Sequence, residues 1–230
     1  GSTEVRLATR AMVSMASRIR RQLSDRTYML AGVSHDLRTP LTRLRLQLAI
    51  FPKSQEIMSM SKDIEEMENM IKGYLSFAKG EEPEKIQLVN VVEEINSIIK
   101  DFQKSKVKNI SLKHKNIFSK IHLKPRSFRR AIENIISNAI RYASNCVIFL
   151  EIVEENIIIN IDDDGPGIPV KERQNALRPF HRLETSRNKE TGGTGLGLAI
   201  ATNIVHIHGG NLELLESPLN GLRVRLIIPI

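Results

Sequence analysis

The sequence has a single cysteine, Cys146, no tryptophan and only 4% aromatic residues. One cysteine excludes a disulfide framework within the chain and fits a reducing compartment. No apolar run approaches the roughly 20 residues that a membrane-spanning helix needs, and the chain does not open on a signal-peptide pattern. Gly1 and Ser2 resemble a cloning remnant, so we expect the natural protein to continue upstream.

Positive charge is in moderate excess, with a formal net charge of +8 over 230 residues. The excess is spread along the chain rather than gathered in one stripe. Nucleic-acid surfaces usually combine a basic stripe with stacking aromatics, so no nucleic-acid partner is expected. An acidic protein or a phosphate ligand suits this charge better. The length predicts two globular units.

The first stretch with a regular apolar period is residues 3–27, which we predict to be helical. Heptad spacing relates Val5, Ala8, Met12, Met15 and Ile19. Leu23 then departs from this phase, and such a stutter locally unwinds a coiled coil. The alternative is a short helix in which Met and Ala are merely adaptable core residues.

A helix carrying His35 is predicted to run to about Phe51. Its apolar positions are spaced alternately three and four apart, at Leu30, Val33, Leu37, Leu41, Leu44, Leu48 and Phe51. His35 lies off this buried stripe, so its imidazole should face solvent. Asp36 and Thr39 share a face beside it, and Pro40 should loosen or kink the helix. The pattern favours an imidazole nucleophile with an adjacent acid that holds its tautomer, and the alternative is a solvated polar face with a chance histidine.

A second helix should pair with this one to form a hairpin. Residues 52–54 make a turn, and an apolar stripe follows at Ile57, Met60, Ile64, Met67, Ile71, Tyr74, Leu75 and Ala78. Two antiparallel helices with one stripe each bury little alone, so we predict a dimeric antiparallel four-helix bundle. Residues 80–84 indicate a linker.

From Leu88 the pattern changes to helices mixed with short strands. Helices are predicted over 89–104, 125–142 and 196–208, and strands over 110–114, 117–123, 146–153, 157–161, 211–216 and 222–228. Gly209 and Gly210 should end the last helix. This order predicts an α/β sandwich, with a layer of helices on a mixed sheet.

Three stretches of the second half carry chemistry. Asn134 and Asn138, beside Glu133, share a helix face and can hold magnesium, although asparagine pairs also occur without a chemical role. The segment Asp162-Asp163-Asp164-Gly165-Pro166-Gly167-Ile168 follows a strand and could bind the exocyclic amine of a flat ligand. The competing interpretation is a calcium loop, but the ligand spacing of such a loop is absent. The segment Gly193-Thr194-Gly195-Leu196-Gly197-Leu198 opens a helix and is typical of a phosphate cradle, but matches neither a Rossmann nor a Walker motif.

In this order, the motifs resemble those of bacterial sensor histidine kinases. Val33 to Leu41 is similar to the family's phosphoacceptor box, Asn134 and Asn138 to its N box, Asp163-x-Gly165-x-Gly167 to its G1 box, Pro179-Phe180-x-Arg182 to its F box, and Gly193 to Leu198 to its G2 box. The string from Met29 to Arg43 is most similar to osmosensor members, and Thr3 to Ile19 resembles the second helix of a HAMP module. The resemblance covers essentially all residues after Ser2.

The resemblance implies roles for three residues of the hairpin. His35 would be the phosphoacceptor, attacking the ATP γ-phosphate through its outer ring nitrogen. Asp36 would hold the other nitrogen and act as base. Thr39 would position water for dephosphorylation of the partner regulator.

The resemblance also implies an ATP-binding domain of the GHKL (Bergerat) type. Asn138, with Asn134, would carry Mg²⁺, and Tyr142 would stack near the base. Asp163 would bind the adenine amine, with Asp162 or Asp164 as alternatives. Residues 169–192 would form a mobile ATP lid, with Arg182 or Lys189 near the phosphates. The other implied nucleotide-binding residues are Gly165, Gly167, Ile168, Phe180, Thr194, Gly195, Leu196, Gly197 and Leu198.

The resulting prediction is the cytoplasmic portion of a bacterial inner-membrane kinase, which reaches the membrane only through upstream segments. Residues 3–24 would be a HAMP or signalling helix, 25–80 the dimerisation and phosphotransfer domain, 81–86 a linker and 87–230 the catalytic domain. The expected partners are a second copy and the receiver domain of an OmpR-like response regulator. Two alternatives are another ATPase of the same nucleotide fold, such as a mismatch-repair or topoisomerase domain, and a scaffold that has lost kinase activity.

Overall fold

The computed structural model describes residues 2–52, 54–78, 84–104, 109–115, 120–181 and 195–230. The chain divides into two compact units, Gly1–Gly80 and Glu81–Ile230. Among the described residues, no helix is long and apolar enough to cross a membrane.

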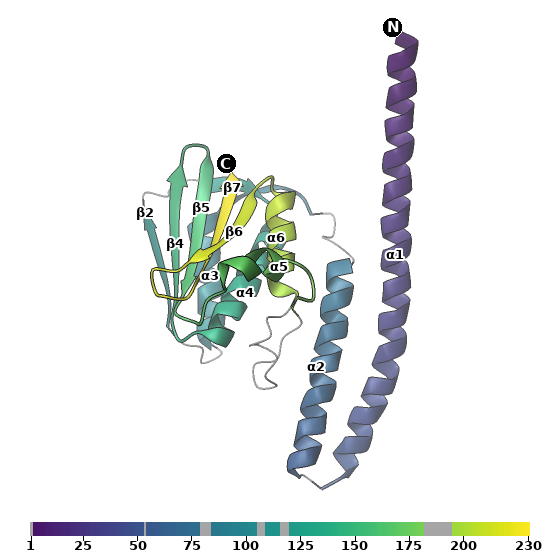
Figure 1. The fold of residues 1–230 in the computed structure, drawn as a ribbon, viewed down its shortest axis with the longest axis vertical. Helices are drawn as coiled ribbons and strands as arrows, with labels where there is room; N and C mark the ends of the chain where they lie inside the picture. Colours follow the sequence, from purple (N-terminus) through teal and green to yellow (C-terminus); the bar gives the residue numbers. More distant parts are fainter. Residues whose placement is uncertain (1, 53, 79–83, 105–108, 116–119, 182–194) are drawn as a thin grey trace. The chain divides into compact units, whose positions relative to one another are not determined.

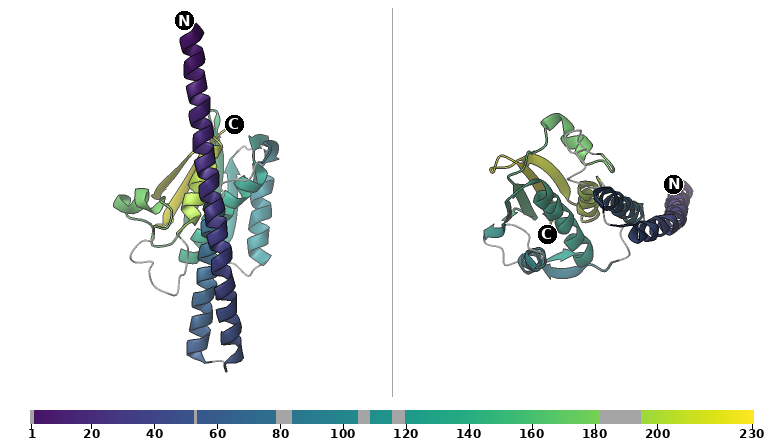
Figure 2. Two further views of the ribbon diagram at one scale, coloured as in Figure 1. Left: turned by 90° about the vertical axis from the view of Figure 1, so that its right-hand side faces the viewer. Right: turned by 90° about the horizontal axis from the view of Figure 1, so that it is seen from below.

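The first unit is a hairpin of two helices, α1 (Ser2–Ile50) and α2 (Gln55–Ala78), which lie side by side (Figures 1 and 2). α1 joins the two predicted helical stretches into one helix and continues through Pro40. The proposed stutter falls between Ile19 and Leu23, whose side chains lie outside the described part of the structure. At the start of α2, Ser54 acts as a cap, because its Oγ accepts a hydrogen bond from the N–H of Ile57 at 3.3 Å.

The apolar stripe of α1 is only partly covered within one chain. Leu41 is 8% exposed and faces the hairpin, as does Ile64 of α2 at 7%. Leu37 and Leu44 are each 46% exposed, so one hairpin buries only part of the predicted stripe, as expected if the stripes bury little within a single chain. The physical reason is that a single neighbouring helix covers only part of an apolar face.

The second unit is built on a five-stranded mixed sheet in the order β2-β4-β5-β7-β6 (Figure 1). Its strands are β2 (Ile110–Lys115), β4 (Cys146–Val153), β5 (Asn156–Asp163), β6 (Asn211–Glu216) and β7 (Leu222–Pro229). β2 is parallel to β4, and the other neighbours are antiparallel. β1 (Gln87–Asn90) pairs separately with β3 (Lys120–Leu123). The predicted mixed sheet is confirmed, whereas β1 was not predicted as a strand.

Three helices cover one face of this sheet: α3 (Val91–Lys104), α4 (Pro125–Tyr142) and α6 (Gly197–Ile207) (Figures 1 and 2). Alternate strand residues point toward them, so the burial of β7 alternates along its length. The core between the layers is mainly branched aliphatic, with Ile95, Ile98, Phe128, Ile132, Ile135, Ile148, Leu150, Ile157 and Ile159 almost fully buried. This arrangement confirms the predicted α/β sandwich.

Arg129 of α4 ties that helix to α3. Its guanidinium group donates to Glu94 at 2.8 Å, to Ser97 at 2.8 Å and to Asp101 at 3.2 Å. Within α4 it also donates to Glu133 at 3.3 Å. Glu133, noted in the sequence beside the asparagine pair, is thus paired with Arg129.

Glu84 caps the start of α4 from 42 residues upstream. Its carboxylate accepts from the backbone N–H groups of Arg126 at 2.7 Å and Ser127 at 3.0 Å, and from the Ser127 hydroxyl at 2.8 Å. Burial acts to raise the pKa of Glu84, but these hydrogen bonds prevail and lower it below its ordinary value. The carboxylate therefore fastens the segment before β1 to α4.

Replacing Glu84 with Gln should lower the free energy of unfolding of the second unit by about 1 kcal/mol at pH 7. A lowered pKa in the folded state stabilises the protein above the ordinary pKa of the group, and this contribution is lost as the pH falls. The difference between parent and variant should therefore shrink from pH 7 toward pH 4. Urea denaturation at both pH values measures it, with Glu155→Gln, at an exposed position on the β4–β5 turn, as control. An equal loss at both pH values would exclude a charge-dependent cap.

Candidate functional site

His35 lies on the exposed surface of α1. Its side chain is 78% exposed, and that of Asp36 is 83% exposed. The ring Nδ1 is 3.3 Å from Asp36 Oδ1, which suits a proton shared between them and leaves Nε2 directed to solvent. Thr39, one helical turn further on, is also exposed. The exposed position predicted for the imidazole is confirmed. The preceding residue, Ser34, is only 4% exposed, so the burial changes within one residue along α1.

Asp163, at the end of β5, is a buried carboxylate with one oxygen engaged. Its Oδ1 accepts from the N–H of Gly165 at 2.9 Å and from the N–H of Leu222 at 3.0 Å. Burial, helped by the charges of Asp164 and Asp162, raises the pKa of Asp163 against the opposing effect of these two hydrogen bonds. Among the described residues, none donates a hydrogen bond to Oδ2.

The aspartates on either side of Asp163 have other partners. Asp162 forms a bidentate pair with Arg223, at 2.7 and 2.9 Å. Asp164 accepts from the N–H groups of Ser144 and Asn145 at 2.7 and 2.9 Å, and these hydrogen bonds lower its pKa. Of the three positions left open by the sequence, the geometry therefore favours Asp163 as the ligand-facing carboxylate.

Close backbone packing surrounds Asp163. A Cβ at Gly165 would lie 3.0 Å from the carbonyl oxygen of Tyr142, so the loop after β5 packs on the end of α4. A Cβ at Gly221 would overlap with the backbone oxygen and Oδ1 of Asp163. Gly167 has a φ of +67° and lies against the carbonyl of Gly221. Gly221 and its neighbour Leu222 were not predicted to belong to the site, because the local sequence indicates only a turn before the last strand.

Asn134, Asn138 and Tyr142 lie four residues apart on α4 and share one face. The amide Nδ2 of Asn134 donates to the carbonyl of Arg130 at 2.7 Å, so its Oδ1 remains an acceptor. A Cβ at Gly197 would lie 3.5 Å from that Oδ1, which places the start of α6 beside the amide. The N box and the end of the G2 box are thus brought together.

The segments on either side of residues 182–194 also meet. Phe180 has a φ of +64°, and its N–H donates to the carbonyl of Gly195 at 3.0 Å. Gly195 has a φ of +66°, and a Cβ there would lie 3.0 Å from the carbonyl of His181. The predicted lid 169–192 begins with two short helical segments that were not predicted, η1 (Val170–Glu172) and α5 (Arg173–Ala176). Arg182, Lys189, Gly193 and Thr194 lie outside the described residues.

The remaining implied contact residues lie at the start of α6 and in the loop after β5. Leu196 is 1% exposed and belongs to the core, so any contact it makes with a nucleotide would come from its backbone. Gly197 and Leu198 begin α6, whose first N–H groups have no partners within the helix. Such an N-terminus favours a phosphate group. Ile168 is partly buried in the loop after β5.

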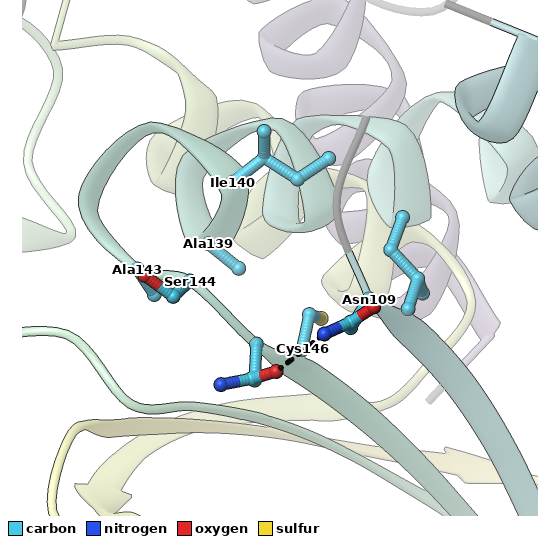
Figure 3. Close-up of a pocket in the computed structure, with 8 residues that line it drawn as sticks. Asn109, Ala139, Ile140, Ala143, Ser144 and Cys146 are labelled. Carbon is cyan, nitrogen blue, oxygen red and sulfur yellow. Dashed lines mark hydrogen bonds between the residues drawn. The ribbon is translucent and has the colours of Figure 1, made fainter. Parts of the chain in front are cut away.

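A small cavity of about 10 Å³ lies under the end of α4 (Figure 3). Ala139, Ile140, Ala143 and Cys146 line it, and Asn109 donates to Asn145 at its edge. This volume is about that of one water site, far too small for a nucleotide. Burial and the nearby charge of Asp163 raise the pKa of the Cys146 thiol to about 12. The thiol is therefore protonated and acts as a small apolar side chain.

Two protein-family models match the chain. Residues 25–83 match the His Kinase A (phospho-acceptor) domain, and residues 123–230 match the histidine kinase-, DNA gyrase B-, and HSP90-like ATPase. The chain belongs to the sensor histidine kinase family. As in other sensor histidine kinases, the phosphoacceptor and ATPase domains follow each other along one chain.

Curated relatives of this histidine kinase chain are similar along its whole length. It is 32% identical to the sensor histidine kinase GtrS of Pseudomonas aeruginosa, and covers 47% of that protein. It is 29% identical to CpxA and 30% identical to RstB of Escherichia coli, and covers 52% and 54% of them. The chain thus spans about half the length of the curated relatives it matches.

Solved structures support the fold. The full-length ShkA complex with AMPPNP superposes with a TM-score of 0.68 at 18% identity, over 87% of this chain and 45% of that one. The Acinetobacter baumannii histidine kinase AdeS gives a TM-score of 0.60 at 22% identity, over 85% and 97% of the two chains. A helical phosphoacceptor region followed by an α/β ATPase domain is therefore the architecture of this family member.

Replacing Gly221 with Ala should lower the free energy of unfolding of the catalytic unit by about 1–3 kcal/mol, because the added methyl group overlaps with the backbone of Asp163. Gly197→Ala is the matched control, since its methyl group would find its nearest neighbour at 3.5 Å. This control should leave stability unchanged or raise it, because Ala favours a helix. Urea denaturation of both variants provides the measurement. Equal free energies of unfolding for Gly221→Ala and Gly197→Ala would show that the loop after β5 and β7 can move apart without loss of stability.

Proposed function

We propose that this chain is an ATP-dependent protein-histidine kinase that phosphorylates itself on His35 and passes the phosphoryl group to an aspartate of a response regulator. The observation that carries the proposal is the exposed His35–Asp36 pair in a chain that also holds an ATPase-type domain. The relatives named as sensor histidine kinases support it. A scaffold without activity is less well supported, because His35, Asn138 and Asp163 are all present.

In the proposed reaction, Nε2 of His35 forms a bond to the γ-phosphorus of ATP while the bond from that phosphorus to the β–γ bridging oxygen breaks and ADP leaves. Asp36 holds the proton on Nδ1, which keeps the lone pair on Nε2, and stabilises the positive charge that develops on the ring. The exposure of the imidazole gives Nε2 access to the phosphate.

The nucleotide would bind between α4, the loop after β5 and the start of α6. Asp163 would accept from the adenine amine through Oδ2, and Tyr142 would stack near the base. The loop residues Gly165, Gly167 and Ile168 and the backbone from Gly195 to Leu198 would line the site. Arg182 or Lys189 would contribute charge near the phosphates, and the exposed Phe180 would anchor the lid.

Magnesium suits the amide oxygens of Asn134 and Asn138. Asn134 keeps Oδ1 free because its Nδ2 is engaged with the Arg130 carbonyl. The described residues contain no cluster of three or more His, Cys, Asp or Glu that could hold a metal, so the ion would be held jointly with the phosphates. When bound, it would neutralise charge on the phosphate oxygens.

A homodimer is the proposed functional state. Large apolar side chains remain exposed along the hairpin, among them Val33, Leu37, Leu44, Met60 and Met67. A second hairpin would bury these faces in an antiparallel four-helix bundle. The proposed limits are 3–24 for a HAMP-derived helix, 25–80 for the phosphotransfer domain, 81–86 for the linker and 87–230 for the catalytic domain. The whole protein would be held at the bacterial inner membrane by segments outside this sequence.

The proposed partner is the receiver domain of an OmpR-like response regulator. Thr39 would support dephosphorylation of this regulator, since its exposed hydroxyl lies one turn from His35 and can both donate to and accept from water. Hydrolysis of the regulator's phospho-aspartate needs such a water, whereas phosphorylation of His35 does not.

His35→Ala should abolish labelling of the full chain by Mg-ATP labelled on its γ-phosphate, while calorimetry shows unchanged binding of a non-hydrolysable ATP analogue. In the parent, the label should be acid-labile and base-stable, as expected of phosphohistidine. His114→Ala, at another exposed histidine, is the control and should keep the label. Asp36→Asn should slow labelling by roughly 100-fold, because the ring loses the negative charge that stabilises the positive charge developing on it. Label retained in His35→Ala would refute the assignment.

Thr39→Ala should keep autophosphorylation and lose most phosphatase activity, and Thr39→Ser should keep part of both. The substrate is a purified phospho-regulator, chosen by its ability to accept phosphate from this chain, and its dephosphorylation is followed with ADP present. Thr42→Ala, on the same helix but less exposed, serves as control. If Thr39→Ala dephosphorylates as fast as the parent, the hydroxyl has no part in the hydrolysis.

A further inference from the structure

The ion pair between Asp162 and Arg223 lies next to Asp163, the proposed adenine contact, because Asp162 precedes Asp163 on β5. The guanidinium group donates from Nε to Oδ1 at 2.7 Å and from Nη2 to Oδ2 at 2.9 Å, so the pair is bidentate. The two side chains are 7% and 21% exposed. Because strand residues alternate, Asp162 points to the sheet face opposite the one that carries Asp163.

This pair occupies the last position at which β5 and β7 are in register. Asp162 faces Arg223 in the ladder, and the preceding residue of β7, Leu222, gives its N–H to Asp163 Oδ1. Upstream of Leu222 the chain turns, with the Ser217 N–H donating to the Gly221 carbonyl at 3.1 Å. The β5–β7 ladder therefore ends at Arg223, and the ion pair is the side-chain contact next to Leu222 that joins the two strands.

We propose that the Asp162–Arg223 pair is a positioning element of the nucleotide site, which holds Leu222 against Asp163 so that Oδ1 is engaged and Oδ2 is presented to the adenine amine. The inference rests on the proposed ATP-binding function and adds two residues to it. Neither residue touches the nucleotide; both act through the backbone of β7.

Charge supports the same inference. Burial is the main cause that raises the pKa of Asp163, and the charges of Asp164 and Asp162 add to it. Arg223 is the cation that faces Asp162 in the ladder. Without Arg223, Asp162 would be a largely buried carboxylate with no compensating charge, one residue from the acceptor. Loss of the pair should therefore both loosen Leu222 and favour the protonated form of Asp163, which cannot accept from the amine through its protonated oxygen.

The same two strands provide a matched control. Arg225 lies two residues further along β7 on the same sheet face, where its Nε donates to Asn160 at 3.0 Å and its Nη1 is 4.0 Å from Glu213. Arg225 is therefore similar to Arg223 in strand and face and also bonds to a β5 side chain, but its hydrogen-bond partner is an amide and it is not next to Leu222. Arg225→Gln should reproduce any general effect of removing an arginine from this sheet.

The test compares binding of an adenine nucleotide and its inosine counterpart, which lacks the amine, to the full chain by calorimetry with Mg²⁺. The parent should prefer the adenine nucleotide. Arg223→Gln should weaken adenine binding by about tenfold while changing inosine binding little, a loss of the size expected for one misplaced hydrogen bond to a buried group. Arg225→Gln should leave the preference within about twofold of the parent. Urea denaturation of each variant checks that both remain folded.

Asp162→Asn provides a second variant, because it keeps an acceptor for Arg223 while removing the charge. It should keep part of the adenine preference, and Arg223→Lys should also restore part of it. An adenine preference in Arg223→Gln equal to that in Arg225→Gln would overturn the positioning role. A parent with no preference for adenine would instead overturn the proposed contact of Asp163, so the two failures are distinguishable.

Discussion

A carboxylate buried at the end of a strand is the constraint on which the nucleotide site depends. Asp163 is 6% exposed, and a buried charge is tolerated only where donors meet it. Its donors are two backbone N–H groups, from Gly165 in the following loop and from Leu222 at the start of β7. For both N–H groups to reach Oδ1, the backbones of the loop and of β7 approach so closely that position 221 has no room for a side chain. Loop, strand and glycine are therefore organised around one carboxylate oxygen, and no described residue donates a hydrogen bond to the other.

Most elements of the catalytic unit could be predicted because their patterns are local. α4 begins at Pro125 and ends at Tyr142, as its apolar period and its opening proline indicate. β1 escaped prediction because four residues carry too little pattern, and its pairing with β3 is a long-range contact. The partner of Asp163 escaped for the same reason, since Leu222 lies 59 residues further along the chain. Local spacing identified the carboxylate but could not identify the strand that holds it.

The hairpin shows the opposite limit, because its sequence contains a longer apolar stripe than a single chain can bury. The stripe from Leu30 to Phe51 is regular, yet Leu41 is buried while Leu37 and Leu44 stay about half exposed. Periodicity identifies an apolar face but not the number of helices that cover it. The same helix places Ser34 in the hairpin interface and His35 beside it in solvent. The direction in which α1 presents its side chains therefore keeps His35 outside whatever the apolar face packs against.

Three consecutive aspartates would repel one another if they shared one environment. The pleat of β5 sends Asp162 toward Arg223 and Asp163 toward the helices, and Asp164, beyond the strand, reaches the N–H groups that follow α4. Hydrogen bonds lower the pKa of Asp164, whereas burial raises that of Asp163. Two of the three carboxylates are thus supplied with donors on both oxygens, by Arg223 and by the turn at Asn145. Of the three carboxylates, the middle one alone combines burial with an oxygen to which no described residue donates. The donors around its neighbours therefore support the proposal that Asp163, rather than Asp162 or Asp164, contacts the nucleotide.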